Sequence, residues 1–353
     1  MIRVERRAHV PMTLGIAASI VAASVALIVT ALLLGLAGTP TSAIGRLMLS
    51  AAFGSPATIV ALATPLMLIG LASVLTFRVG LINLGAEGQI VAAALTALAV
   101  SSGVLQVPPL AIVPLAIAAG AVSNALALAL IVVLKLRLRV DEAVVTILLN
   151  IAMLFAVQLL TGGTLASLPP IGAVQPLPIA NAADLPGWGQ DLHGVLAPLI
   201  AVIACLMSFA LLRFTIWGLE IRATGGNTVA ARFAGVRVNS IKLKVAMFSG
   251  LLIGLVGAGQ AISTAGGATP NLVLGLGYAG IAVAFLAARD PLGVIPAALF
   301  VSVLLTAIGA ANRETGVPLA LGNVVVATLL IAALMAHGSI RYRLRFRSWS
   351  EAP

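Results

Sequence analysis

The sequence predicts an all-α membrane protein, a polytopic helical bundle that crosses the bilayer about ten times. Of its 353 residues, 61% are hydrophobic and only 8% are charged, which is more apolar surface than a water-soluble chain of this length can bury. Apolar runs of about twenty residues, the length that a bilayer-spanning helix needs, recur from end to end. The short alternating segments typical of barrel strands do not occur. Residues 1–353 are therefore expected to form one transmembrane domain.

The first apolar run, from Met12 to about Leu36, follows a basic start and is too long to be the core of a cleaved signal peptide. It predicts a retained first membrane helix. Residues 38–56 are expected to lie along the external surface. The apolar pattern predicts about ten membrane helices, which cover residues 12–37, 57–76, 88–105, 109–134, 142–162, 194–214, 245–265, 271–289, 292–311 and 318–337.

Two of these helices, over residues 88–105 and 271–289, are short or rich in glycine. We expect each to be a broken or partly re-entrant element. Irregular backbone at membrane depth is tolerated only where protein or a water-filled cavity covers it, because lipid offers no hydrogen bonds. In the helix over 245–265, the glycines instead indicate close helix packing, since small residues let helices approach each other in lipid.

The basic residues predict the orientation of the chain. Of the 20 Lys and Arg residues, all except Arg46 and Arg313 fall on one side of the predicted helices. Basic residues are retained on the cytoplasmic side of membrane proteins, so both termini are expected in the cytoplasm. The predicted external loop over residues 163–193 agrees, because it contains Asp184 and Asp191 but no Lys or Arg.

Several classes of function are disfavoured by the sequence. The net charge of +10 is not gathered in a basic patch with aromatic residues, so no nucleic-acid partner is expected. With Cys205 as its only cysteine, the chain cannot form an internal disulfide, and isolated histidines give no metal site. The phosphate-binding loop G-x-x-x-x-G-K-[ST] and the motif H-E-x-x-H do not occur. We expect no enzyme active site and no cofactor on this chain.

The stretch TFRVGLINLGAEGQI, residues 76–90, places Asn83, Glu87 and Gln89 between two apolar runs. A carboxylate near hydrocarbon is costly unless it is hydrogen-bonded or faces water. Two interpretations stay open. The stretch lines or gates a translocation path, or Glu87 satisfies backbone donors at a broken helix end.

Single polar residues within other predicted helices, including Asn124, Asn150 and Gln260, are either hydrogen-bonding contacts between helices or the lining of a path for a polar, uncharged solute. No group of titratable residues resembles a proton relay, which disfavours an ion-coupled carrier. The candidate residues of a translocation path are Asn83, Glu87, Gln89, Asn124, Asn150 and Gln260.

Residues 215–244, TIWGLEIRATGGNTVAARFAGVRVNSIKLK, form the one long basic and polar stretch between apolar runs. It is either an ordinary cytoplasmic loop or the place where a soluble partner binds. Asn227 is predicted to cap a short helix from Thr228 to Phe233, and Gly235 to end it. We expect the small residues of this helix to enter a cleft on the partner. The candidate contact residues are Arg222, Asn227, Ala230, Ala231, Arg232 and Gly235.

Three stretches resemble the permease subunits of bacterial ABC importers for simple sugars, nucleosides and branched-chain amino acids. GLINLGAEGQ at 80–89 resembles the signature after the second helix of that superfamily. GNTVAARFAG at 226–235 is similar to its cytoplasmic coupling loop, although Val229 stands where an acid is usual. GYAGIAVAFLAARDPLGVIPAALF at 277–300 is similar to a late block, and the likeness covers most of residues 55–335.

Within this superfamily, the long first helix, the stretch DEAVVTILLN at 141–150 and the long external loop most resemble nucleoside-type permeases that work with a basic-membrane-protein lipoprotein. The resemblance implies a multi-pass protein of the bacterial cytoplasmic (inner) membrane, in contact with lipid. It also implies a dimer of like or unlike permease chains, a separate ATPase that uses ATP and Mg, and an external solute-binding lipoprotein. The alternatives are a ribose-type sugar permease, an ion-coupled secondary carrier and a membrane protein that only anchors others.

Overall fold

The computed structural model describes residues 2–6, 11–54, 56–101, 108–162, 195–263, 275–340 and 342–346. The predicted external loop over 163–193 lies outside the described residues. The helices, in chain order, are α1 (Met12–Leu36), α2 (Thr41–Phe53), α3 (Pro56–Arg78), α4 (Ala86–Ser101), α5 (Pro109–Leu138), α6 (Glu142–Gly162), α8 (Ala197–Phe214), α9 (Ile216–Gly226), α10 (Thr228–Phe233), α11 (Val238–Ser263), α12 (Leu276–Leu286), α13 (Val294–Thr315) and α14 (Leu321–Ser339).

Seven helices of the described part are long and apolar enough to cross a membrane, namely α1, α3, α5, α8, α11, α13 and α14. Shorter apolar helices occupy the other three predicted spans, as α4, α6 and α12. The two spans expected to be broken are the shortest, with 16 residues in α4 and 11 in α12. The chain is therefore a polytopic helical bundle, while the number of crossings stays a prediction.

Two segments differ most from those expected. The helix predicted to start at residue 245 starts at Val238, so the end of the 215–244 stretch is the first two turns of α11 and not a loop. Residues 38–56 contain α2, whose buried face includes Leu47 and Ala51. Both changes have the same cause, because each segment has an apolar stripe at helical spacing that packs against a neighbouring helix.

Helix α3 lies at the centre of the bundle. It packs against α8, α11, α12 and α13, and it is the most buried of the seven long apolar helices. Its residues from Ala63 to Thr76 are all buried, on every side of the helix. A helix that is apolar all round is stable only when other helices or lipid surround it. The first residues of the candidate site follow directly from the end of this helix.

Helix α11 packs closely on α4 and α5 through the glycines that the sequence singled out. A Cβ on Gly250 would lie 2.7 Å from the Asn124 carbonyl oxygen, and a Cβ on Gly254 would lie 2.6 Å from the Gly120 carbonyl oxygen. Gly257 lies in the same way against the backbone of Ile90 in α4. The predicted packing role of these glycines is confirmed, since any side chain would separate the helices.

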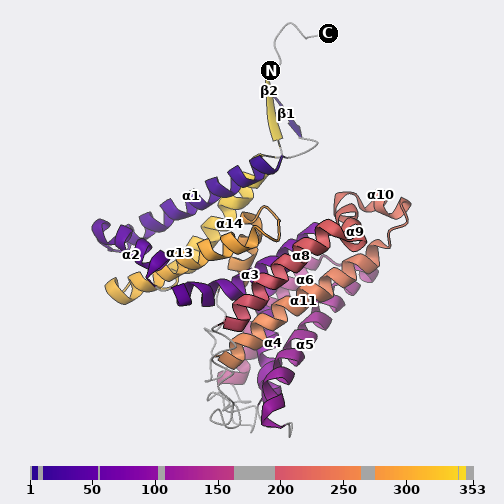
Figure 1. The fold of residues 1–353 in the computed structure, drawn as a ribbon, viewed down its shortest axis with the longest axis horizontal. Coiled ribbons are helices and arrows are strands. Elements are labelled where there is room, and N and C mark those ends of the chain that lie inside the picture. The colour runs from indigo at the N-terminus through magenta and orange to yellow at the C-terminus, as the bar shows by residue number, and fades with distance from the viewer. Residues whose placement is uncertain are drawn as a thin grey trace.

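Figure 1 shows α1, α2, α13 and α14 on one side of the molecule and α5, α8 and α11 on the other. The three ion pairs between described residues each join residues that the sequence places on the same side of the membrane. Arg78 with Asp290 and Lys135 with Glu142 lie at the predicted cytoplasmic end. Arg46 lies 3.3 Å from Glu314 at the opposite end, where α2 packs against α13.

The ends of the chain form a feature that an all-α prediction missed. Strand β1 (Ile2–Arg6) pairs in antiparallel fashion with β2 (Tyr342–Phe346), with Ile2 opposite Phe346. The pairing brings the two ends of the chain together (Figure 1). Five-residue segments rich in Arg give little β signal in the sequence, because their partner is more than three hundred residues away. The cytoplasmic location of this end stays a prediction.

We predict that Gly254→Leu destabilises the bundle, because the added side chain must push α11 away from α5. Overpacking of this kind costs about 1–3 kcal/mol or more. Gly338→Leu in α14 is the matched control, since a Cβ there meets nothing within 4 Å. The midpoint of thermal unfolding in detergent measures the difference, and equal midpoints for the two variants would contradict the packing described for α11.

Candidate functional site

Residues 79–85 interrupt the helical backbone between α3 and α4. The N–H groups of Val79, Gly80 and Leu81 still donate to carbonyls at the end of α3, but those of Ile82 and Leu84 have no helical partner. Leaving such groups unpaired inside a membrane is costly. Polar side chains of α6 supply the partners. Glu142 Oε1 accepts from the Ile82 N–H at 3.3 Å, and Thr146 Oγ1 accepts from the Leu84 N–H at 3.2 Å. Asn150 Oδ1 accepts from the Gly88 N–H at 2.7 Å, at the start of α4.

We refer to residues 81–89, together with Glu142, Thr146 and Asn150, as the polar clasp. The three α6 residues are four apart, so they share one face of that helix. Asn150 also donates from Nδ2 to the Leu84 carbonyl at 2.9 Å and to the Tyr278 hydroxyl at 3.3 Å. The clasp thus holds an irregular segment against one helix by side chain to backbone hydrogen bonds at three successive turns.

Two glycines allow α6 to approach this closely. A Cβ on Gly85 would lie 2.6 Å from the Thr146 carbonyl oxygen, and a Cβ on Gly88 would lie 2.9 Å from the Asn150 backbone nitrogen. Either contact would push α6 away and lengthen the hydrogen bonds of the clasp beyond their range. The glycines of GLINLGAEGQ are therefore explained by the close approach of α6.

Asn83 and Gln89 bind each other. Asn83 Nδ2 donates to Gln89 Oε1, Gln89 Nε2 donates to Asn83 Oδ1, and both distances are 3.1 Å. Asn83 Oδ1 also accepts from the Gly85 N–H at 3.0 Å. Asn83 is 5% exposed and Gln89 is fully buried. The amide pair closes the irregular turn onto the start of α4, which satisfies both side chains within the clasp.

Glu87 lies where the two short helices α4 and α12 meet. Its Oε1 accepts from the Gly275 N–H at 2.5 Å, at the N-terminus of α12. The residue is 9% exposed, and Gly277 of α12 packs directly against it. An N-terminal helix end carries unpaired N–H groups and a partial positive charge, both of which favour a carboxylate. Glu87 thus satisfies a backbone donor, as one of the two interpretations expects, and its place on a translocation path stays a prediction.

The remaining candidates of the translocation path lie elsewhere. Asn124 is 1% exposed and donates from Nδ2 to the Gly250 carbonyl at 2.8 Å, which joins α5 to α11. Gln260 is half-buried near the C-terminal end of α11. The structure therefore brings Asn83, Glu87, Gln89 and Asn150 together in one cluster and leaves these two apart.

Sequence reasoning missed Glu142, Thr146 and Tyr278 as members of this cluster. The signal was present for two of them, because Glu142, Thr146 and Asn150 stand at four-residue spacing in a mostly apolar helix. Glu142 also forms an ion pair with Lys135 of α5, which anchors the start of α6. Nothing local to Tyr278 indicated its contact with Asn150, because the two residues come from helices far apart in the chain.

The second candidate site is the segment between α8 and α11. Thr215 Oγ1 caps α9 by accepting from the Gly218 N–H at 3.1 Å. Asn227 Oδ1 caps α10 by accepting from the N–H groups of Val229 and Ala230 at 2.9 and 3.1 Å. Gly235 follows with a φ of 83°, a left-handed conformation that favours glycine. The predicted cap, short helix and glycine stop are confirmed.

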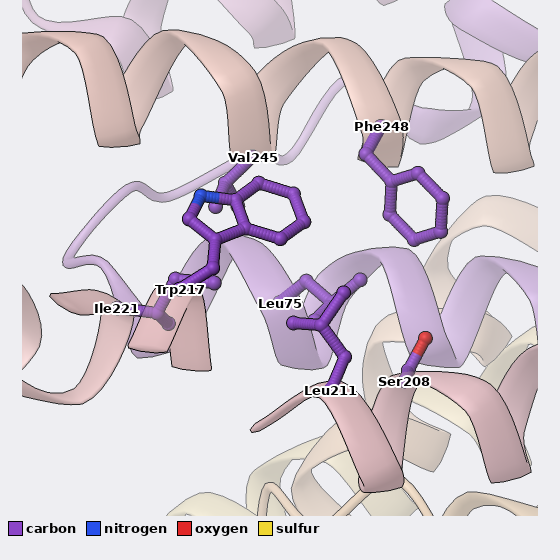
Figure 2. Close-up of a pocket in the computed structure, with 7 residues that line it drawn as sticks. All are labelled: Leu75, Ser208, Leu211, Trp217, Ile221, Val245 and Phe248. Carbon is purple, nitrogen blue, oxygen red and sulfur yellow. The ribbon is translucent and has the colours of Figure 1, made fainter. Parts of the chain in front are cut away.

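Helix α9 is attached to the membrane helices by one face. Figure 2 shows Trp217 and Ile221 of α9 beside Leu211 of α8 and Val245 of α11. These side chains line a small, mostly apolar hollow of about 10 Å³, and Ile221 is 1% exposed. Because the lining is apolar, the hollow has the character of a helix junction and not of a path for a polar solute. Arg222 of the same helix is exposed.

One expectation for α10 is wrong. Ala231 is 3% exposed and faces the protein, so it does not offer a free surface to a partner. A tryptophan at Ala231 would disturb the fold itself, and a side chain at Gly235 would strain the backbone. The exposed members of the predicted contact set are Arg222, Asn227, Ala230, Arg232 and Gly235. Val229 and Phe233 are also exposed, at 60% and 89%, and the predicted contact set did not include them.

Comparison with known proteins now identifies the family. The profile described as branched-chain amino acid transport system / permease component matches residues 55–334. The chain belongs to this family.

Curated relatives of this permease include three ABC transporter permease proteins. A glucose permease of Haloferax volcanii is 28% identical over 283 residues, or 76% of this chain and 72% of the relative. A guanosine permease of Bacillus subtilis is 27% identical over 270 residues, or 75% and 76%. A nucleoside permease of Lactococcus lactis is 28% identical over 265 residues, or 72% and 71%. No solved structure gives a significant match.

The family places the two sites in a common context. The permease is a multi-pass membrane protein, and its relatives are transport subunits that are not themselves enzymes. The matched range includes the polar clasp, the segment with α9 and α10, and the helices α12 and α13. The three motifs that suggested the superfamily thus lie on the elements that form or join the candidate sites.

We predict that Glu87→Leu impairs transport or assembly more than Glu87→Gln. The glutamine retains an oxygen that can accept from Gly275 N–H, whereas leucine leaves that donor unpaired, at about 1–3 kcal/mol. Solute uptake and thermal unfolding measure the two variants side by side. The matched control is Glu314, whose side chain is 49% exposed and where both changes should be mild. Wild-type uptake by the Glu87→Leu variant would show that Glu87 is not needed for transport.

Proposed function

We propose that the chain is the permease subunit of an ATP-driven importer in a bacterial cytoplasmic membrane, and that it forms the translocation path for a nucleoside or a related sugar-containing solute. The proposal rests first on family membership and on relatives named as guanosine and nucleoside permeases. The relative named as a glucose permease favours a second candidate, a simple sugar of the glucose or ribose type.

The observation that best supports coupling to an ATPase is the exposed apolar face of α10. Val229 and Phe233 are one helical turn apart, so they lie on the same face of this short helix. Both apolar side chains are exposed, and so are the charged residues Arg232 and Arg237 of the same segment. A large apolar surface among charged residues is unfavourable in water unless a partner covers it. We propose that an ATPase subunit receives α10 in an apolar cleft.

In this arrangement the partner ATPase binds ATP and Mg, and this chain binds neither. A second permease chain, like or unlike this one, completes the membrane part. A solute-binding lipoprotein delivers the solute from outside. The outward faces of α1 and α8 expose large apolar side chains, such as Ile20 at 61% and Met207 at 67%, which suit contact with lipid or with the second permease.

The test of the proposed function is uptake into vesicles that contain the permease, its ATPase and its lipoprotein. Guanosine, ribose and glucose are offered separately, with and without ATP. ATP-dependent uptake of guanosine supports the nucleoside importer, and ATP-dependent uptake of a sugar supports the second candidate. Uptake by the permease alone, driven by an ion gradient, would show a secondary carrier instead. A complete lack of uptake would favour a role in anchoring.

We predict that Phe233→Ser weakens binding of the ATPase and reduces uptake at least several-fold. The change removes the largest exposed apolar side chain of α10 and leaves the buried Ala231 contact intact. Phe53→Ser is the matched control, because Phe53 is 78% exposed at the other end of the molecule. Co-purification of the ATPase and uptake are measured for both variants. If the Phe233→Ser variant retains the ATPase and takes up solute normally, residues 215–244 are only a connecting loop and do not bind the ATPase.

A further inference from the structure

Arg78, the last residue of α3, joins three elements at the predicted cytoplasmic end of the bundle. Its Nε and Nη2 both donate to the Arg289 carbonyl oxygen, at 3.0 and 2.9 Å. Its Nη2 also lies 3.7 Å from Asp290 Oδ1. Both side chains of the ion pair are mostly buried, with 24% and 30% of their surface exposed. Arg78 therefore holds the turn that follows α12.

This turn is conformationally strained. Ala288 and Arg289 have φ values of 51° and 63°, so two successive residues with side chains adopt the left-handed conformation. This conformation is unfavourable for residues other than glycine, and it persists only where surrounding contacts impose it. The paired donors of Arg78 on the Arg289 carbonyl supply such a contact. Arg78 thus adds two side-chain bonds to a turn that backbone hydrogen bonds, such as Arg289 N–H to the Ala284 carbonyl at 3.2 Å, also close.

The third element is α9, in the segment proposed to bind the ATPase. Gly225 lies directly against the Arg78 carbonyl oxygen, with no room for a Cβ. A displacement of α9 toward the end of α3 therefore meets the backbone of Arg78 directly. Because the guanidinium of the same residue holds the turn at 287–290, the displacement is passed on to α12.

Helix α12 is short and closely packed along its whole length. Its 11 residues span about 16 Å. Val283 packs against Gly70 of α3, where a Cβ on the glycine would lie 2.8 Å from the valine side chain. The Phe285 and Phe77 rings are 5.1 Å apart between centroids. At its other end, the Gly275 N–H binds Glu87. A helix this closely packed moves as a rigid body.

We propose that Arg78 is the positioning residue that transmits movement of α9 to α12, and through α12 to Glu87 in the polar clasp. The inference rests on the proposed function, because it requires an ATPase that moves α9. It assigns to Arg78 a role distinct from binding either partner. Arg78 contacts neither the exposed face of α10 nor the clasp, yet it lies against the elements that connect them.

The decisive variant is Arg78→Lys. Lysine keeps the positive charge near Asp290 but lacks the planar pair of donors that grips the Arg289 carbonyl. Arg46→Lys is the matched control, because Arg46 forms the exposed ion pair with Glu314 at the opposite end. Asp290→Asn is a second variant, and its effect should be weaker, because the bonds from Arg78 to the Arg289 carbonyl remain.

The readout is a thiol at the start of α12. Leu276→Cys is introduced into a chain in which the single cysteine is removed by Cys205→Ala. The importer is assembled with its ATPase in lipid nanodiscs, and the labelling rate of the thiol is compared with and without a non-hydrolysable ATP analogue. Uptake, ATP hydrolysis, co-purification of the ATPase and thermal unfolding are measured on the same variants.

With Arg78 present, we expect the ATP analogue to change the labelling rate. With Arg78→Lys, we expect ATPase binding, ATP hydrolysis and thermal stability to stay at the level of Arg46→Lys. The change in labelling should disappear and uptake should fall several-fold. Normal uptake and labelling in Arg78→Lys would overturn the inference. A loss of ATPase binding or stability would also overturn it, because Arg78 would then act only in folding or docking. If the parent chain shows no ATP-dependent uptake, the proposed function fails, and this inference fails with it.

Discussion

The need to pair every backbone polar group within a membrane is the constraint on which this structure depends. Residues 79–85 leave the helical conformation inside a bundle of apolar helices, so the N–H and C=O groups that do not pair with a helix end need other partners. Glu142 and Thr146 accept from the Ile82 and Leu84 N–H groups, and Asn150 binds the Leu84 carbonyl, all from one face of α6. The irregular segment is possible only because this row of polar side chains lies beside it. The position of α6, the glycines that it approaches and the start of α4 all follow from the same requirement.

Close packing at glycine residues is the second feature that holds these helices together. The hydrophobic effect does little to hold helices together in lipid, so contact area and hydrogen bonds must do so. Gly85 and Gly88 let α6 reach the backbone that it binds, and Gly254 lets α11 lie against α5. The polar clasp and the helix packing therefore depend on each other, because the hydrogen bonds keep their length only while the helices stay in contact.

The arrangement also relates the two sites to each other. The segment with α9 and α10 is at one end of the bundle, and Glu87 lies at the N-terminus of α12. Between them are the end of α3, the turn at 287–290 and the short helix α12, which contact one another in sequence. A transport protein needs a connection of this kind if chemistry on a partner is to change access to a path in the membrane. Here the connection consists of stiff elements joined by specific side chains.

The sequence by itself determined what depends on neighbouring residues. The apolar runs predicted the helices, and Asn227 and Gly235 marked the ends of α10, because caps and stops act within a few residues. The tertiary structure alone decided which groups meet. Thr146 binds a backbone group 62 residues away, and Arg78 binds one 211 residues away. It also decided that Ala231 faces inward while Phe233 faces out. Local patterns carry no information about such pairs, since the free energy that selects them arises only when distant segments pack together.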